Sequence, residues 1–118
     1  MHELSIVMSI LEIAEIHAAG AGAESVEAIE LEIGCLSGIE MDAFEFAWKQ
    51  AVKNTLLAGA VRTIHRIPGE AICPECSGRF PVQSVLDDCP QCGNPLIAIQ
   101  HGKELRIKSL LVPEKMNT

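Results

Sequence analysis

Two pairs of cysteines are the residues of this chain best suited to hold a metal ion. They read Cys73-Pro74-Glu75-Cys76 and Cys89-Pro90-Gln91-Cys92, with twelve residues between the pairs. A Cys-x-x-Cys pair forms a tight turn that points both sulfurs at one cation, and two such turns complete the tetrahedron of thiolates that zinc prefers. Proline after the first cysteine of each pair restricts the turn. We therefore predict a structural zinc site made by Cys73, Cys76, Cys89 and Cys92.

The same cysteines have other interpretations: two disulfides, a redox pair or a rubredoxin-like iron site. The chain opens MHELSIVMSILEIAEIH, without a basic leader or a small-residue cleavage site, so we expect a reducing cytosol, where disulfides are rare. A redox protein usually carries one Cys-x-x-Cys rather than two. Iron sites of this type are usually packed with aromatic side chains, and Phe80 is the only aromatic residue after Trp48. Zinc is favoured, and iron or a redox pair remains the alternative. Both Gly78 and Gly93, just beyond the two pairs, are expected at positive φ.

The start of the chain, Met1-His2-Glu3, is a second candidate metal site. The terminal amine, the His2 amide and the His2 imidazole can chelate one ion in a five-membered and a six-membered ring, and Glu3 can supply a fourth donor. Deprotonated amide nitrogens in a square plane favour Ni(II) or Cu(II) over zinc. Taken alone this signal is weak, because many chains carry a histidine near the start without binding metal. Structural roles are favoured for His17, His65 and His101. Cys35 is interpreted as a small buried hydrophobe or an inert thiol.

Composition narrows the class of protein. The 118 residues are 48% hydrophobic but only 3% aromatic, which suits a small aliphatic core. Nine basic and 16 acidic residues give a net charge of −7, and this sign opposes binding to nucleic-acid phosphates. No apolar run reaches the length that spans a membrane. The chain has no Ser/His/Asp arrangement, phosphate loop or carboxylate pair that demands catalysis, so we expect neither an enzyme nor a nucleic-acid or membrane protein.

Hydrophobic periodicity predicts the elements that position these residues. Helical spacing covers residues 4–19 and again 41–58, and the predicted strands are 26–34, 61–67 and 105–112. Apolar residues almost encircle the first helix, so we expect it to be covered on several sides. A lone strand is not stable, so the last strand should return to the sheet of the first two. The fold class predicted is α+β: a small mixed sheet of about three strands with two helices, plus an inserted zinc-ribbon module.

Taken together, these features closely resemble the HypA/HybF family, the nickel-insertion accessory proteins of [NiFe]-hydrogenase maturation. The resemblance rests on Met1-His2-Glu3-Leu4-Ser5, Glu32-Ile33-Gly34, the two cysteine pairs and Gly102-Lys103-Glu104-Leu105, and it covers essentially the whole chain. It implies two domains. Residues 1–69 and 104–113 would form a nickel-binding α/β domain, and residues 70–103 a zinc ribbon whose Zn(2+) is structural.

The resemblance also implies a nickel site and its ligands. By the family pattern, His2 is the essential ligand, with the Met1 amine and the backbone nitrogens of His2 and Glu3 around it. An acidic residue in the loop before the second helix is a further ligand in some members. Glu40 occupies that place here. Its side chain is longer than that of the aspartate in the family pattern, so its carboxylate has a different reach.

The function implied by the resemblance is that of a cytoplasmic nickel metallochaperone. It would bind Ni(2+) transiently at its amino terminus and deliver it to the [NiFe]-hydrogenase large subunit. The partners implied are that subunit, a HypB-type GTPase and, for some members, urease maturation factors, and the chain would be a monomer or homodimer. The alternative interpretation is a zinc-ribbon adaptor for protein interactions without a nickel role.

Overall fold

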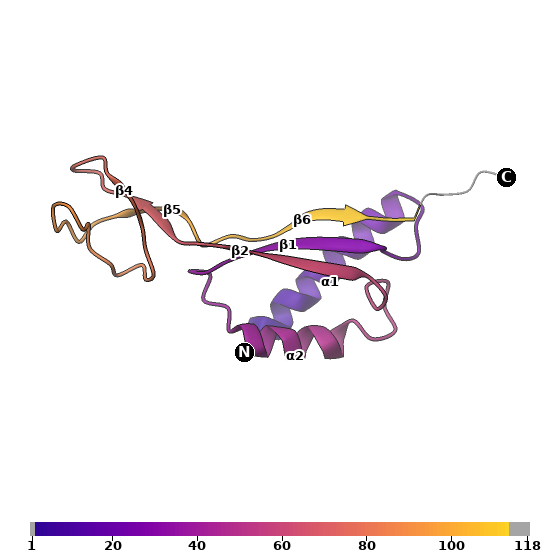
Figure 1. Cartoon of the computed structure of the whole chain (residues 1–118). Helices are drawn as coiled ribbons and strands as arrows, with labels where there is room; N and C mark the ends of the chain where they lie inside the picture. Colours follow the sequence, from indigo (N-terminus) through magenta and orange to yellow (C-terminus); the bar gives the residue numbers. More distant parts are fainter. Residues whose placement is uncertain (1, 114–118) are drawn as a thin grey trace. The chain divides into compact units, whose positions relative to one another are not determined.

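The computed structural model describes residues 2–113, which form two helices and six strands (Figure 1). In chain order these are α1 (His2–Gly20), β1 (Ala28–Gly34), α2 (Met41–Ala51), β2 (Val61–Ile67), β3 (Glu70–Ile72), β4 (Arg79–Pro81), β5 (Ala98–His101) and β6 (Leu105–Leu111). Among the residues described, no helix has the length and apolar character needed to cross a membrane.

The described chain divides into two compact units. The first comprises residues 2–31, 40–63 and 107–113, and it contains both helices. The second comprises residues 32–39 and 64–106, and it contains β3, β4, β5 and the four paired cysteines. The assignment of residues 70–103 to a separate zinc-ribbon domain stays a prediction.

The longer strands form one sheet in the order β2-β1-β6 (Figure 1). The predicted return of the last strand is therefore confirmed, because β6 pairs with β1 although β2 to β5 separate them in sequence. The alternation predicted for β1 is also present. Ile29, Leu31 and Ile33 are fully buried, whereas Glu30 and Glu32 on the opposite face are only partly covered. Apolar burial on one face thus fixes the register of the central strand.

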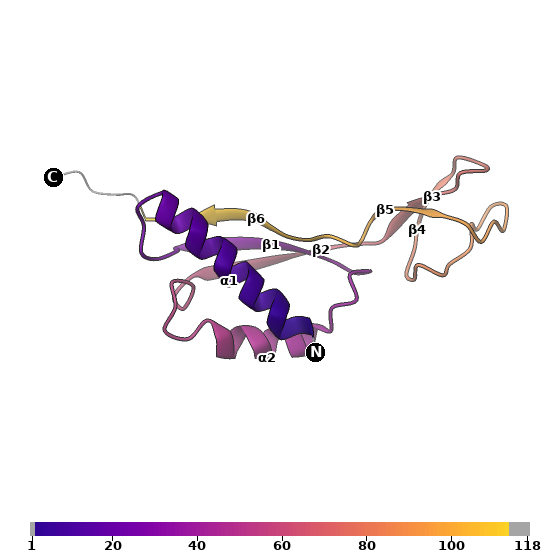
Figure 2. The same ribbon diagram turned by 180° about the vertical axis from the view of Figure 1, so that it is seen from behind.

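Helix α1 packs beside α2 in the first unit (Figure 2). Its buried side chains recur at helical spacing and form a single stripe: Val7, Ile10, Leu11, Ala14 and Ala18. The expectation that α1 would be covered on several sides is wrong. Several large apolar side chains outside the stripe are exposed, namely Leu4, Met8, Ile13 and Ile16. Apolar residues around a helix therefore do not by themselves show that it is enclosed.

Helix α2 ends at Ala51, earlier than the predicted residue 58. Asn54 adopts a positive φ of 60°, a left-handed conformation that does not continue a helix. The turn that contains Asn54 is closed by the next side chain, because the Thr55 hydroxyl donates a hydrogen bond of 2.6 Å to the Val52 carbonyl oxygen. The apolar periodicity beyond Ala51 belongs to a packed loop rather than to helix.

Three short strands form a second antiparallel sheet in the order β4-β3-β5. They lie within the cysteine module and were not predicted, because strands of three or four residues show little alternation. Their core is small and includes two of the paired cysteines: Ala71, Cys73, Phe80, Val82 and Cys89. A core of this size rarely stabilises a fold without a metal or disulfide.

Two glycines let backbones meet in the second unit. A Cβ on Gly34, the last residue of β1, would lie 1.9 Å from the Gly102 carbonyl oxygen. Gly102 itself has a φ of 118°. The contact is held by two hydrogen bonds, from the Gly34 N–H to the Glu104 carbonyl oxygen (2.7 Å) and from the Leu36 N–H to the Gly102 carbonyl oxygen (2.6 Å). Only glycine fits at both positions.

Candidate metal centre

The structure brings the four paired cysteines together. Their sulfur atoms all lie within 4.8 Å of one another, and the closest pairs, Cys73 with Cys92 and Cys76 with Cys89, are 3.6 Å apart. Thiolates about 2.3 Å from a tetrahedral zinc ion would be separated by roughly 3.8 Å. The spacing therefore fits a tetrathiolate zinc site. Cys73 and Cys89 are buried, whereas Cys76 and Cys92 are exposed.

The two cysteine turns have the same backbone hydrogen bonds. In the first, the Ser77 N–H donates to the Cys73 carbonyl oxygen at 2.8 Å, and in the second the Gly93 N–H donates to the Cys89 carbonyl oxygen at 2.8 Å. The first cysteine of each turn also donates its N–H to the carbonyl oxygen five residues later, at 2.9 Å in both turns. The two turns are thus structural copies that present their sulfurs alike.

The turns differ in the residue that takes the left-handed conformation. Gly93 has a φ of 74°, as predicted, but the prediction for Gly78 is wrong, because the equivalent conformation falls on Ser77, with a φ of 61°. Gly78 instead lies close to the Gln91 and Cys76 side chains. A Cβ there would lie 2.8 Å from the Gln91 side-chain oxygen and 3.4 Å from the Cys76 sulfur.

Backbone N–H groups stabilise the thiolate of the first cysteine in each turn. Hydrogen bonds from the Cys76 and Glu75 N–H groups lower the pKa of Cys73 to about 6, although burial of this sulfur acts in the opposite direction. The pKa of Cys89 is lowered in the same way, by the N–H groups two and three residues later. The backbone of the two turns therefore favours the thiolate form of two of the four sulfurs.

The second cysteine of each turn resists ionisation. The Asn94 N–H acts to lower the pKa of Cys92, but the hydrogen bond with Cys73 and burial outweigh it, and the pKa of Cys92 rises to about 12. The pKa of Cys76 is also raised. The Gly78 N–H acts to lower it, but the Cys89 thiol and burial outweigh that effect. A divalent cation would supply the charge that allows all four sulfurs to ionise together.

The amino-terminal residues gather at the start of both helices. Helix α1 begins at His2, whose exposed imidazole Nε2 lies 3.4 Å from the Glu3 carboxylate. That carboxylate is largely buried and accepts a hydrogen bond of 3.2 Å from the Glu40 N–H, immediately before α2. The first turns of α1 and α2 accordingly lie side by side (Figures 1 and 2). Met1 lies outside the described residues.

The electrostatic environment at the start of the two helices favours the ionised form of the Glu3 carboxyl group. The Glu40 N–H, followed by the N–H of Glu3 itself, lowers the pKa of Glu3 against the effect of burial, and His2 adds to the lowering. Glu3 is therefore ionised at neutral pH. The exposed side chains of Glu40 and Asp42 add negative charge at the start of α2. Because the first N–H groups of a helix donate no intrahelical bond, the amide nitrogens of His2 and Glu3 are not committed to the helix.

The remaining sequence-predicted residues lie apart from these clusters. His101 pairs with Glu104, with 3.1 Å between Nδ1 and the carboxylate oxygen, and His17 is exposed in the last turn of α1. Cys35 is exposed, so its interpretation as a small buried residue is wrong. Within residues 2–113, the four-cysteine group is the single cluster of three or more potential metal ligands.

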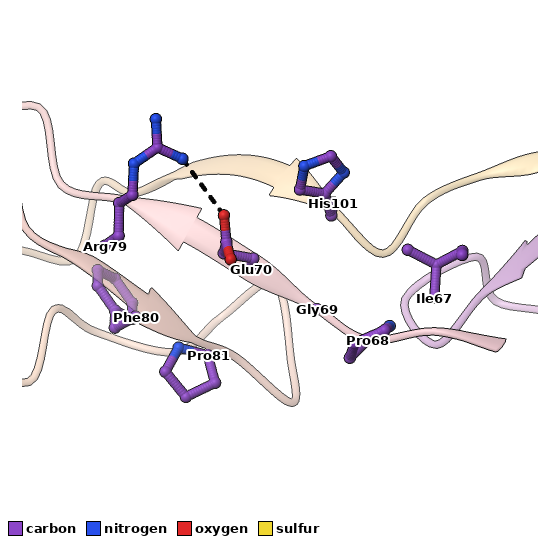
Figure 3. Close-up of a pocket in the computed structure, with 8 residues that line it drawn as sticks. All are labelled: Ile67, Pro68, Gly69, Glu70, Arg79, Phe80, Pro81 and His101. Carbon is purple, nitrogen blue, oxygen red and sulfur yellow. Dashed lines mark hydrogen bonds and ion pairs between the residues drawn. The ribbon is translucent and has the colours of Figure 1, made fainter.

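Sequence patterns did not predict a groove of about 440 Å³ in the second unit (Figure 3). Glu70 and Arg79 point toward each other across adjacent strands and form an ion pair of 3.3 Å, with His101 on the neighbouring strand. The groove has both polar and apolar walls. Its only sequence signal is Pro68-Gly69, which precedes β3.

Comparison with known proteins identifies the family to which this chain belongs. Residues 1–112 match the family model described as "Hydrogenase/urease nickel incorporation, metallochaperone, hypA". This chain is a member of the HypA family. Hydrogenase maturation factor HypA of Parabacteroides distasonis is 45% identical over 115 residues, covering 98% of this chain and 100% of the relative. The HypA relative from Geobacter metallireducens is also 45% identical, over 95% of this chain and 99% of the relative.

Solved structures of HypA proteins share the fold. The solution structure of the Ni metallochaperone HypA from Helicobacter pylori superposes with a TM-score of 0.69 at 27% identity, covering 98% of this chain and 100% of that one. The resemblance to the HypA/HybF family is thus confirmed, and with it a place among nickel-incorporation metallochaperones of hydrogenase maturation.

Proposed function

We propose that this chain binds Ni(II) at its amino terminus and delivers it to the large subunit of a [NiFe]-hydrogenase. The observation that carries this proposal is the grouping of the exposed His2 imidazole, the ionised Glu3 and the Glu40 backbone at the start of two helices. The imidazole, the terminal amine and the first amide nitrogens form a donor set suited to square-planar Ni(II). Glu40 contributes negative charge and a further carboxylate donor.

The two metal centres suit different tasks. Four thiolates from Cys73, Cys76, Cys89 and Cys92 would hold zinc with no open position, and that metal would supply folding energy to the small core around it. The His2 imidazole is exposed, so an incoming ligand can displace the amino-terminal donors one at a time. Nickel is cargo at this site, and it leaves by ligand exchange to thiolates of the receiving protein.

The bond between Glu3 and Glu40 positions the nickel donors. Because the Glu3 carboxylate holds the Glu40 N–H, the start of α2 stays beside the start of α1. The negative charges of Glu3 and Glu40 then compensate the positive ends of both helix dipoles, which would otherwise disfavour a cation. The HypB-type GTPase is the second partner proposed, as the protein that acts with this chain in nickel transfer.

Nickel binding by untagged protein tests the proposal directly. Untagged wild type should bind one nickel ion per chain in a calorimetric titration, while His2→Ala and an amino-terminally extended form should lose that binding. Zinc content, measured by metal analysis, should be the same in all three. His17→Ala is the matched control, because this histidine is exposed on the same helix and should leave nickel binding unchanged.

Equal nickel binding by wild type, His2→Ala and the extended form would reject the amino-terminal site. Absence of nickel binding by the wild type would favour the alternative, a zinc-ribbon adaptor for protein interactions.

A further inference from the structure

The outer face of α2 carries an exposed aromatic side chain between two hollows. Phe46, in the middle of the helix, is 68% exposed. On one side of it is a cavity of about 170 Å³ with almost entirely apolar walls, formed by Glu3 and Leu4 of α1 and by Ala43, Ala47 and Gln50 of α2. Leu4 is itself 49% exposed. An exposed aromatic beside an apolar cavity is typical of a protein-binding surface.

The second hollow is larger and carries positive charge. It has a volume of about 720 Å³, and its walls include Phe46, Lys49, Lys53 and Arg62. Arg62 is held in place, because it donates two hydrogen bonds of 2.7 Å to the Glu45 carboxylate and lies 5.0 Å from the Trp48 ring centroid.

The positive charge available in this hollow therefore comes from Lys49 and Lys53. The Arg62 charge is already neutralised by Glu45, whereas both lysines are exposed. Lys53 donates a hydrogen bond to Gln50, a residue that also borders the small cavity. In a chain with a net charge of −7, such a cationic position selects for acidic groups on a partner.

We infer that Phe46, its two hollows and these lysines form the docking surface for the protein that receives nickel, the hydrogenase large-subunit precursor. The segment that docks presents an apolar side chain to the small cavity and, a few residues away, carboxylates to Lys49 and Lys53. This inference rests on the proposed function, because it names the partner of the amino-terminal site.

The position of the surface supports this assignment. Glu3 borders the small cavity and also lies 3.4 Å from the His2 imidazole. Ligand exchange requires the receiving protein to come within bonding distance of His2, so that protein must cover the residues next to it. The exposed apolar residues at this end of the helix pair, Leu4 and Phe46, are then the first surface that it meets. A rigid helix face also positions the acceptor better than a loop would.

Two substitutions with matched controls test the surface. Phe46→Ala removes the exposed aromatic and Lys49→Glu reverses one charge. Leu86→Ala and Lys103→Glu make the same kinds of change at exposed positions in the other unit. Untagged, nickel-loaded full-length proteins are titrated against the hydrogenase large-subunit precursor and against the HypB-type GTPase, and the nickel affinity of each variant is measured separately.

The docking surface predicts weaker binding of the large-subunit precursor, the protein that receives nickel. Phe46→Ala should weaken it at least tenfold, on the order of an interface hot spot. Lys49→Glu should weaken it at low salt and less so as salt screens the charge. Both controls should bind as the wild type does, and all variants should keep wild-type nickel affinity.

Other outcomes would overturn the inference. Unchanged binding of the large-subunit precursor to Phe46→Ala and Lys49→Glu would do so, and so would a precursor that does not bind the wild type. Weaker binding of the GTPase alone would assign the surface to the GTPase instead. A dimer that Phe46→Ala converts to a monomer, with partner binding unchanged, would assign the surface to a second copy of the chain. Loss of the proposed nickel function is a separate result, since it appears as absent nickel uptake by the wild type.

Discussion

Glu3 makes a contact that the sequence did not predict. Its carboxylate is largely buried and bound to the Glu40 N–H, while its part in nickel binding stays a prediction. No spacing rule connects residues 3 and 40, because the contact depends on how two helices meet. The four paired cysteines, by contrast, could be found from spacing alone, since each turn is local and its geometry is set within a few residues.

At the residue scale, ionisation of Glu104 should make the free energy of unfolding depend on pH in the acidic range. Burial opposes ionisation of this carboxylate, but the Gly102 N–H, at 2.6 Å, and His101 outweigh it, so the pKa of Glu104 lies below its ordinary 4.5. Because the pKa is lowered in the folded state, the ionised carboxylate stabilises the protein above pH 4.5. That contribution is lost as the pH falls through the pKa of the folded state. Urea unfolding of Glu104→Gln should show a loss of about 1 kcal/mol at pH 7 and a flatter pH dependence below 4.5.

Glu75→Gln is the control for that measurement, because Glu75 is exposed in a turn and should leave the pH profile unchanged. A wild-type acid profile retained by Glu104→Gln would show that other carboxylates are responsible.

At the scale of elements, periodicity predicted the two helices and the three longer strands, and it failed at ends and at short strands. Helix α2 stops at Ala51 because of the left-handed Asn54, and apolar spacing beyond that point carries no information about backbone conformation. Strands β3, β4 and β5 are too short for an alternation to be recognised. The exposed apolar residues of α1 show a third limit, since periodicity does not reveal what covers a helix.

The contact between Gly34 and Gly102 should tolerate no side chain at Gly34. An added Cβ would lie 1.9 Å from a carbonyl oxygen, so the backbone would have to shift and break the hydrogen bonds that join these segments. Gly34→Ala should cost about 3 kcal/mol or more of unfolding free energy, or prevent folding. Thermal and urea denaturation measure this directly.

Gly20→Ala is the matched substitution, because a Cβ at the end of α1 would meet nothing within 4 Å. A loss at Gly34→Ala no greater than that at Gly20→Ala would contradict the crowding described for this contact.

At the scale of the whole molecule, each unit has its own core. Both helices belong to the first unit, whereas the small core of the second includes Cys73 and Cys89. Sequence patterns suggested a separate cysteine module over residues 70–103, because it interrupts the strands that form the larger sheet. The boundaries of each unit follow from three-dimensional contacts and could not be predicted from composition.

Metal removal should therefore unfold one part of the chain. Chelation of zinc, or Cys76→Ser, should abolish ordered amide signals from the cysteine module in NMR spectra, while the helical far-ultraviolet signal largely remains. Zinc added back should restore the chelated protein but not the variant. Cys35→Ser is the control, because Cys35 lies outside the cluster and should bind zinc as the wild type does. Retention of every module signal without zinc would show that the metal does not stabilise this unit.

The order of the larger sheet has a consequence for synthesis of the chain. Strand β1 lies between β2 and β6, and β6 is synthesised after every other element of the described residues. A product truncated after His101 would contain all the proposed metal donors, yet one side of β1 would lack its neighbour. Such a strand edge invites pairing with other chains, so incomplete products are expected to aggregate and to be degraded rather than to sequester nickel.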